Sequence, residues 1–60
     1  MGRRVEVEVP AIDEYLSKVD AAGGRIVVPK WAVPEVAWHA YCTDSEGSIF
    51  GVMQADPKAA

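Results

Sequence analysis

One stretch of this sequence has helical periodicity, and the other patterned stretches have the two-residue period of strands. In "AIDEYLSKVDAAGG", residues 11–24, apolar side chains recur at the i, i+4, i+7 spacing of one helix face, at Ile12, Leu16 and Val19. Pro10 suits the first helical turn, and the Gly-Gly pair ends the helix with one glycine in the left-handed conformation. A single helix can cover only one face of a four-stranded sheet, so the second face needs other cover.

The first predicted strand precedes this helix. Residues 3–9 alternate strictly, with valines on one face and Arg4, Glu6 and Glu8 on the other. Three further strands are predicted at residues 25–29, 37–42 and 48–54, with a Pro-containing connection at 30–36 and a turn at 43–48. The pattern therefore predicts an α+β fold.

The expected architecture is a single β-α-β-β-β module with one helix on a four-stranded mixed sheet. We expect one domain over residues 1–60, with an ordered part at 3–54 and a flexible tail at 55–60. A chain this short buries only about 60% of the surface that it exposes when unfolded, so it usually needs further stabilisation. Cys42 is the only cysteine, which excludes an internal disulfide, and no Cys/His cluster offers a structural zinc site. Oligomerisation is the remaining route.

Strand periodicity assigns side chains to the two faces of the sheet. The apolar valine face of the first strand should lie under the helix, together with Phe50 and Val52. For the third strand, periodicity alone leaves two sets open for the helix side, which are Trp38, Ala40 and Cys42, or Ala37, His39 and Tyr41. The first set is the more uniformly apolar and is assigned to the helix side. The opposite face then carries a mixture of polar and apolar side chains: Glu6, Glu8, His39, Tyr41, Ile49, Gly51 and Met53.

Charge and composition exclude several classes of function. The net charge is −3 and the lysines and arginines are scattered, so there is no basic stripe for nucleic acid. No segment has the pattern of a signal peptide, and no apolar run approaches the roughly 20 residues of a membrane span. We therefore expect a cytoplasmic setting, with no nucleic-acid or membrane partner.

The order of these elements resembles a known family. "AIDEYLSKVDAAGGRIVVPKWAVPEVAW" followed by "DSEGSIFGVMQ" is similar to the C-terminal half of proteins of the glyoxalase/bleomycin-resistance/extradiol dioxygenase group, the vicinal oxygen chelate superfamily. The likeness covers residues 5–54. It implies that the chain is a half module, and that two modules pair, by gene fusion or dimerisation, into an eight-stranded cup around a site. Ser45, Ser48, Glu35 and Ala37 depart from the family's habits in the turn and the loop.

The resemblance also bears on metal binding. Metal-dependent members place a His or Gln in the first strand and a Glu in the last strand, and the resemblance puts these positions on or near Arg4 and on Gly51. Neither residue can act as the usual ligand, because glycine has no side chain and a guanidinium is a permanent cation. Gly51 is therefore interpreted as a ligand position without its side chain, which leaves room in a pocket. The alternatives are a bulge or a close backbone approach.

Several side chains are candidates for chemistry, each with a simpler structural interpretation. His39 offers a base, a metal ligand or a hydrogen-bond donor, and otherwise is a polar residue satisfied within the fold. Glu8 with His39, and Glu6 beside them, offer a weak alternative site for a divalent metal ion, and otherwise are solvated carboxylates. Tyr41 is expected to line the pocket. Trp31, placed in the connection, is expected to cap the cup or lie in a subunit interface.

Three classes of function follow. The favoured one is a homodimer, formed through the second sheet face and the sheet edge, that makes a small-molecule-binding cup without a metal or other cofactor. The second is a metal-dependent lyase, isomerase or dioxygenase-type enzyme with a non-standard Glu/His site. The third is a structural half that needs a different partner module.

Overall fold

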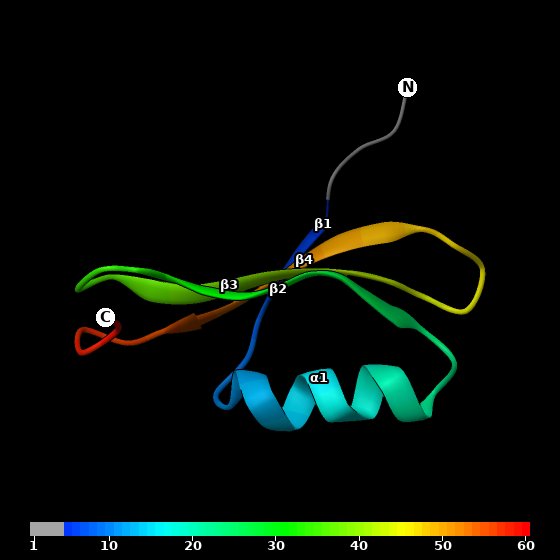
Figure 1. Ribbon diagram of the computed structural model, residues 1–60, viewed down its shortest axis with the longest axis horizontal. Helices are drawn as coiled ribbons and strands as arrows, with labels where there is room; N and C mark the ends of the chain where they lie inside the picture. The colour runs from blue at the N-terminus through cyan, green and yellow to red at the C-terminus, as the bar shows by residue number, and fades with distance from the viewer. Residues whose placement is uncertain (1–4) are drawn as a thin grey trace.

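The computed structural model describes residues 5–60, and Arg4, assigned above to the mixed face, lies outside the described residues. The elements follow the order β-α-β-β-β (Figure 1), which confirms the expected fold class. Their bounds are β1 Val5–Glu8, α1 Ile12–Ala21, β2 Arg25–Val33, β3 Ala37–Thr43 and β4 Ile49–Ala55.

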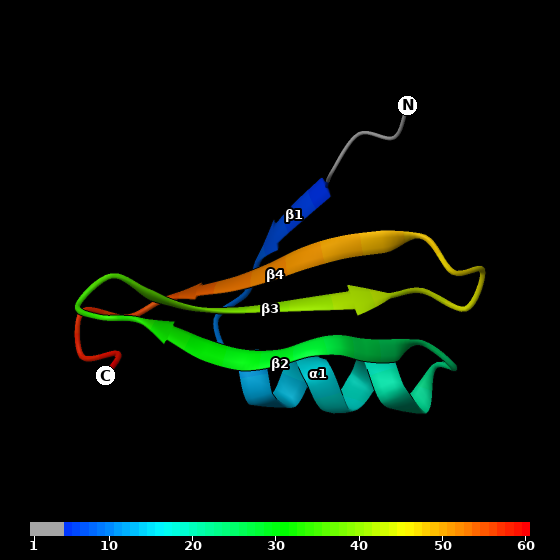
Figure 2. The ribbon, with the colours of Figure 1, turned by 45° about the horizontal axis from the view of Figure 1, so that its top comes forward.

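The four strands form one mixed sheet with the order β1-β4-β3-β2. β1 runs parallel to β4, and the β2–β3 and β3–β4 pairs are antiparallel. The helix packs on one side of the sheet only (Figure 1), where it contacts β2, β3 and β4. Because β1 lies at the far edge of the sheet (Figure 2), α1 does not reach over it.

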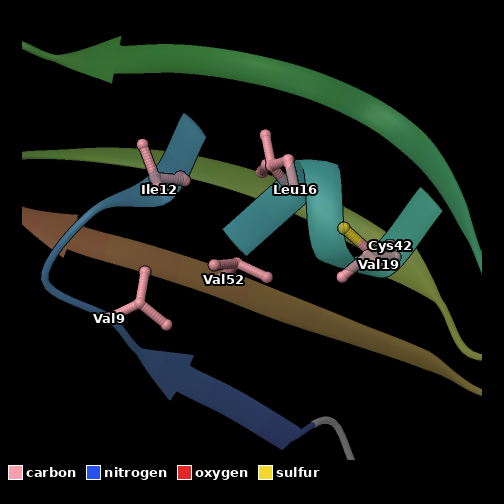
Figure 3. Packing of buried hydrophobic residues seen from close by; sticks show 7 residues of the cluster. Val9, Ile12, Leu16, Val19, Cys42 and Val52 are labelled. Atoms are coloured by element: carbon pink, nitrogen blue, oxygen red, sulfur yellow. The ribbon is translucent and has the colours of Figure 1, made fainter. Parts of the chain in front are cut away.

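The core lies between the helix and the sheet (Figure 3). Its helix contribution is the predicted stripe, and its sheet contribution comes mainly from β3 and β4. The buried cluster comprises Val9, Ile12, Leu16, Val19, Ala40, Cys42 and Val52. Ala40 and Cys42 are buried in this cluster and Trp38 packs against it, which confirms the assignment of that set to the helix side. Each large apolar side chain buried here contributes about 1.5–3 kcal/mol.

β2 is longer than the sequence pattern indicated. The expected strand ended at residue 29, but β2 continues to Val33, so the placement of residues 30–33 in a connection was wrong. Nine residues of β2 lie opposite the seven of β3, and two register shifts, between Ile26 and Val28 and between Val28 and Trp31, accommodate the difference. These shifts break the two-residue period. Pro29 is compatible with β2 because β2 is an edge strand.

The C-terminal residues, expected to be a flexible tail, form a turn that is bonded to the rest of the fold. The Asp56 backbone N–H donates to the Val36 carbonyl at 3.0 Å, and Trp38 Nε1 donates to the Asp56 carboxylate at 3.2 Å. The Glu35 N–H donates to the Ala59 carbonyl at 3.0 Å, and Ala59 is buried. These partners are distant in the sequence, so no local pattern indicates them.

The start of α1 depends on a side chain from β4. Ala11, in extended conformation, precedes the helix and has no side chain that can cap it. The orphan N–H of Ile12 instead donates to the Oε1 atom of Gln54 at 2.8 Å. This bond joins the beginning of the helix to the end of the last strand.

The helix ends at two glycines that have different roles. Gly23 has a φ of 92°, the left-handed conformation expected for one residue of the pair. Gly24 lies so close to β3 that an added Cβ would collide with the Thr43 carbonyl oxygen, and it would lie 2.9 Å from Val19 Cγ1. Gly24 thus lets the chain turn tightly from α1 into β2. Within the described residues, no helix is long and apolar enough to cross a membrane.

Gln54 gives a direct test of the helix cap. We expect Gln54→Ala to lower the free energy of unfolding by about 0.5–2 kcal/mol, because the Ile12 N–H loses its acceptor. Gln54→Glu keeps the acceptor and places a negative charge at the helix N-terminus, so it should remain close to the wild type. Urea denaturation of the three proteins measures this, and equal stability of the alanine and wild-type proteins would contradict it.

Cys42 gives a pH-dependent test of the core. Burial raises the pKa of the Cys42 thiol above its ordinary value, so the folded state favours the protonated thiol. The stabilisation is fully present below the unfolded thiol's pKa, about 8.5, and is lost as the pH rises from there through the folded pKa.

We therefore expect the unfolding free energy of the wild type to fall more steeply between pH 8 and pH 10 than that of Cys42→Ala. The difference in slope is at most about 1.4 kcal/mol per pH unit, the value for one proton. Urea denaturation under reducing conditions measures both slopes. Parallel slopes would show that the thiol titrates equally in both states.

Candidate functional site

The side of the sheet away from the helix is here called the open face. The seven residues predicted for this side lie on it, because Ala40, Cys42 and Val52 alternate with those of β3 and β4 and point into the core. The open face also receives Trp31, which contacts the rings of β3. Its residues include Glu6, Glu8, Trp31, His39, Tyr41, Ile49, Gly51 and Met53, and the same register adds Arg25, Val28 and Thr43.

Strand register arranges most of these residues in two rows across the sheet. The first row runs from Glu6 on β1 through Gly51 on β4 and Tyr41 on β3 to Val28 on β2. The second row runs from Glu8 through Met53 and His39 to Trp31, so both rows cross all four strands. Ile49 lies outside these rows, opposite Thr43 at the start of β4, and its side chain is 53% exposed.

Gly51 has a different environment from the one predicted. A Cβ at this position would lie 3.2 Å from Cε1 of Tyr41 and 3.4 Å from Cγ of Glu6. The ring of one neighbour and the stem of the other therefore fill the space that a larger residue would need. The β3–β4 register has no shift at this point, so Gly51 is not at a bulge. It is a glycine under a cross-strand aromatic ring.

Trp31 is the residue of this face whose position sequence reasoning missed. It was expected in a loop, but β2 continues through it and places it directly opposite His39. The Trp31 ring centroid lies 5.4 Å from that of His39, with an interplanar angle of 30°, and 5.7 Å from that of Tyr41, at 32°. The missed signal was "KWAV", which resumes a strand pattern after the break at Pro29.

The three candidates for metal binding, Glu6, Glu8 and His39, all lie on this face, but they do not gather into one site. Glu8 and His39 both align with Met53, one from β1 and the other from β3, so the methionine lies between them in the row. In residues 5–60, no three side chains of His, Cys, Asp or Glu gather closely enough to hold a metal ion. The described part of this face therefore offers at most two protein ligands, from strands that are not adjacent.

The charges of the two faces differ. On the helix side, Lys30 Nζ lies 2.8 Å from the Asp13 carboxylate and 4.7 Å from the centroid of the Trp38 ring. On the open face, the two rows carry the carboxylates of Glu6 and Glu8, and Arg25 lies beside them in a third row, opposite Thr43 and Ile49. The open face thus combines aromatic rings with negative charge along β1, and its one described arginine lies on β2, at the other edge of the sheet.

A hollow on the helix side was not predicted from the sequence. It has a volume of about 390 Å³ and lies beside the helix, where β1 is left uncovered. Its lining is mainly apolar and comprises Val5, Val7, Tyr15, Asp44, Ser48, Ile49 and Phe50. The hollow forms because a ten-residue helix that packs on β2, β3 and β4 does not extend to the far edge of the sheet.

Because Tyr41 lies over Gly51, we expect the effects of substitutions at these two positions on the free energy of unfolding to depend on each other. We expect Gly51→Val to destabilise the wild type by about 1–3 kcal/mol, because its side chain overlaps the tyrosine ring. In a Tyr41→Ala background the same substitution should be neutral or stabilising, because a β-branched residue suits a strand that is no longer covered.

A double-mutant cycle from urea denaturation gives the coupling energy, which we expect to be about 0.5–3 kcal/mol. Ile49→Val, on the same strand but outside the tyrosine contact, is the matched control and should show additivity with Tyr41→Ala. Additive effects of the Gly51 and Tyr41 substitutions would show that the ring does not restrict this position.

Comparisons with known proteins do not indicate a function, so a functional hypothesis has to start from the geometry of the open face. No protein-family model matches this sequence, and a search of curated proteins finds no significant match.

Proposed function

We propose that this chain is a glyoxalase-like half module, that two copies pair into a cup, and that the cup binds a small molecule without the metal site of the resembling family. The observation that carries the proposal is the open face, where half-buried His39, Tyr41 and Met53 lie beside Trp31, which is 37% exposed. A face of this composition is too apolar for ordinary solvent surface and holds polar groups that could orient a ligand.

The two edges of the sheet support pairing through β1. The β2 edge carries Pro29, which lacks an N–H, and two register shifts, and such features oppose the addition of another strand. β1 pairs with β4 over four consecutive residues without a shift, so its backbone is regular. A second strand can therefore add to the β1 edge and not to the β2 edge.

The hydrogen bonding of β1 identifies the groups that such a strand would use. The Val9 N–H donates to the Met53 carbonyl at 2.8 Å. Because alternate residues of a strand direct their backbone groups to opposite sides, Val5 and Val7 also face β4, and the backbones of Glu6 and Glu8 face outward. If two β1 strands pair about a two-fold axis perpendicular to the sheet, both open faces remain on the same side and form one cup.

The residues present favour binding without the family's metal pair. The position that holds a metal ligand in the last strand is occupied by Gly51 and covered by Tyr41. The metal-dependent alternative would have to use Glu8 and His39, which are separated by Met53. A cytoplasmic setting belongs to the same proposal, and the free thiol of Cys42 is compatible with it.

The solution mass tests the pairing. Light scattering on a gel-filtration column should give about 13 kDa, twice the 6.5 kDa chain, over a range of concentrations. Glu6→Pro removes an outward N–H of β1 and should shift the protein toward the monomer, because the edge loses a donor for the partner strand.

Glu6→Thr removes the same carboxylate but keeps the N–H, and this control should remain dimeric. A folded wild-type monomer at all concentrations would contradict the proposal and favour a different partner module. A dimer that Glu6→Pro leaves intact would contradict pairing through the β1 edge.

A further inference from the structure

The aromatic side chains of the open face form a platform with a fixed arrangement. Trp31 packs against His39 and Tyr41 at centroid distances of 5.4 and 5.7 Å, and all three are anchored on adjacent strands with paired backbones. Trp31 nevertheless keeps 37% of its surface exposed. A large ring held in place by its neighbours loses little entropy when a ligand packs on it, so this platform is preorganised for binding.

Negative charge lies beside this platform. The Glu6 stem and the Tyr41 ring both reach the space above Gly51, at 3.4 and 3.2 Å from the position of an added Cβ. The absence of a side chain at Gly51 therefore lets a carboxylate-bearing side chain approach the aromatic rings across β4. Glu8 occupies the corresponding place in the row of Trp31.

We propose that the open face binds an organic cation, such as an aromatic or alkyl ammonium compound, whose apolar body packs on Trp31 and whose positive charge lies toward Glu6 and Glu8. Aromatic faces attract ammonium groups through the ring quadrupole, and desolvation in a cup strengthens this attraction. A neutral aromatic ligand would leave the carboxylates uncompensated, and an anion would be repelled by them.

This inference names the ligand class of the proposed function and rests on it, because pairing completes the site. In a dimer joined through β1, the two β1 strands are neighbours at the centre of the cup. Glu6 and Glu8 of one copy then lie on the same face as the same residues of the partner. The four carboxylates then lie between two aromatic platforms, so a bulky organic cation can contact carboxylates of both copies at once.

Three soluble benzyl compounds of different charge test the ligand class: benzyltrimethylammonium, benzyl alcohol and benzoate. The two tryptophans provide an internal comparison in an NMR titration, because Trp31 lies on the open face and Trp38 lies on the helix side under Lys30, bonded to Asp56. We expect saturable shifts of the Trp31 indole signal with the ammonium compound, much weaker effects of the other two compounds, and an unchanged Trp38 signal.

Substitutions assign the two parts of the site. Trp31→Leu should weaken the binding of benzyltrimethylammonium about threefold to tenfold, read from the Tyr41 and Met53 signals, because an aliphatic side chain has no ring quadrupole. The Glu6→Gln/Glu8→Gln double variant keeps shape and hydrogen bonding, and should weaken binding and reduce its salt dependence. Glu14→Gln, an exposed carboxylate on the helix, is the matched control and should change neither.

The outcomes separate the inference from the proposed function, since the mass and the titration are measured on the same sample. A dimer whose Trp31 signal does not respond to the ammonium compound overturns the cation site and leaves the pairing. A monomer whose signal responds overturns the pairing. Equal responses to benzyl alcohol, preference for benzoate, or displacement of the ammonium compound by submillimolar Zn²⁺ would each overturn the assignment to an organic cation.

Discussion

The structure depends on the packing of one ten-residue helix against one face of a four-stranded sheet. The helix has a single apolar stripe, Ile12, Leu16 and Val19, so its burial stabilises only the strands beneath it. β1 therefore depends on its parallel pairing with β4 and on Val9, which reaches the core. The open face and the uncovered strip along β1 have the same cause, because one helix of this length cannot cover more of the sheet.

The fold was predictable to the extent that local patterns are undisturbed by distant contacts. Leu16 faces the core as its helical spacing predicts, and Val7 points to the helix side as expected. The expectation that the valines of β1 lie under the helix was wrong for the strand's beginning, because α1 does not reach over β1 and Val5 is 55% exposed. β2 was predicted too short because Pro29 and two register shifts interrupt its period. The turn at Asp56 and the cap from Gln54 use partners far away in the sequence, and no local pattern encodes such bonds.

In the candidate site, too, local patterns predicted some features, and contacts between distant residues determine the others. Periodicity assigned the residues of the open face correctly to one side, because a strand has only two sides and the core set was evident from its composition. It could not indicate what occupies the space at Gly51, since that depends on the register between β3 and β4 and on the direction of the Tyr41 ring. Trp31 was missed for a related reason, because its place follows from the irregular register of β2.

Gly51 connects the stability of the sheet with the chemistry of its open face. A glycine within a strand costs about 0.5–1 kcal/mol relative to alanine, so the strand alone would favour a larger residue. Any side chain there would displace the Tyr41 ring or the Glu6 stem, and these are the groups through which aromatic and negative character meet on this face. Tyr41 in turn supports Trp31, whose ring lies 5.7 Å away. A substitution that relieves the glycine's cost would therefore disturb the platform, so the backbone preference of the strand and the side-chain packing of the open face make opposite demands on this one position.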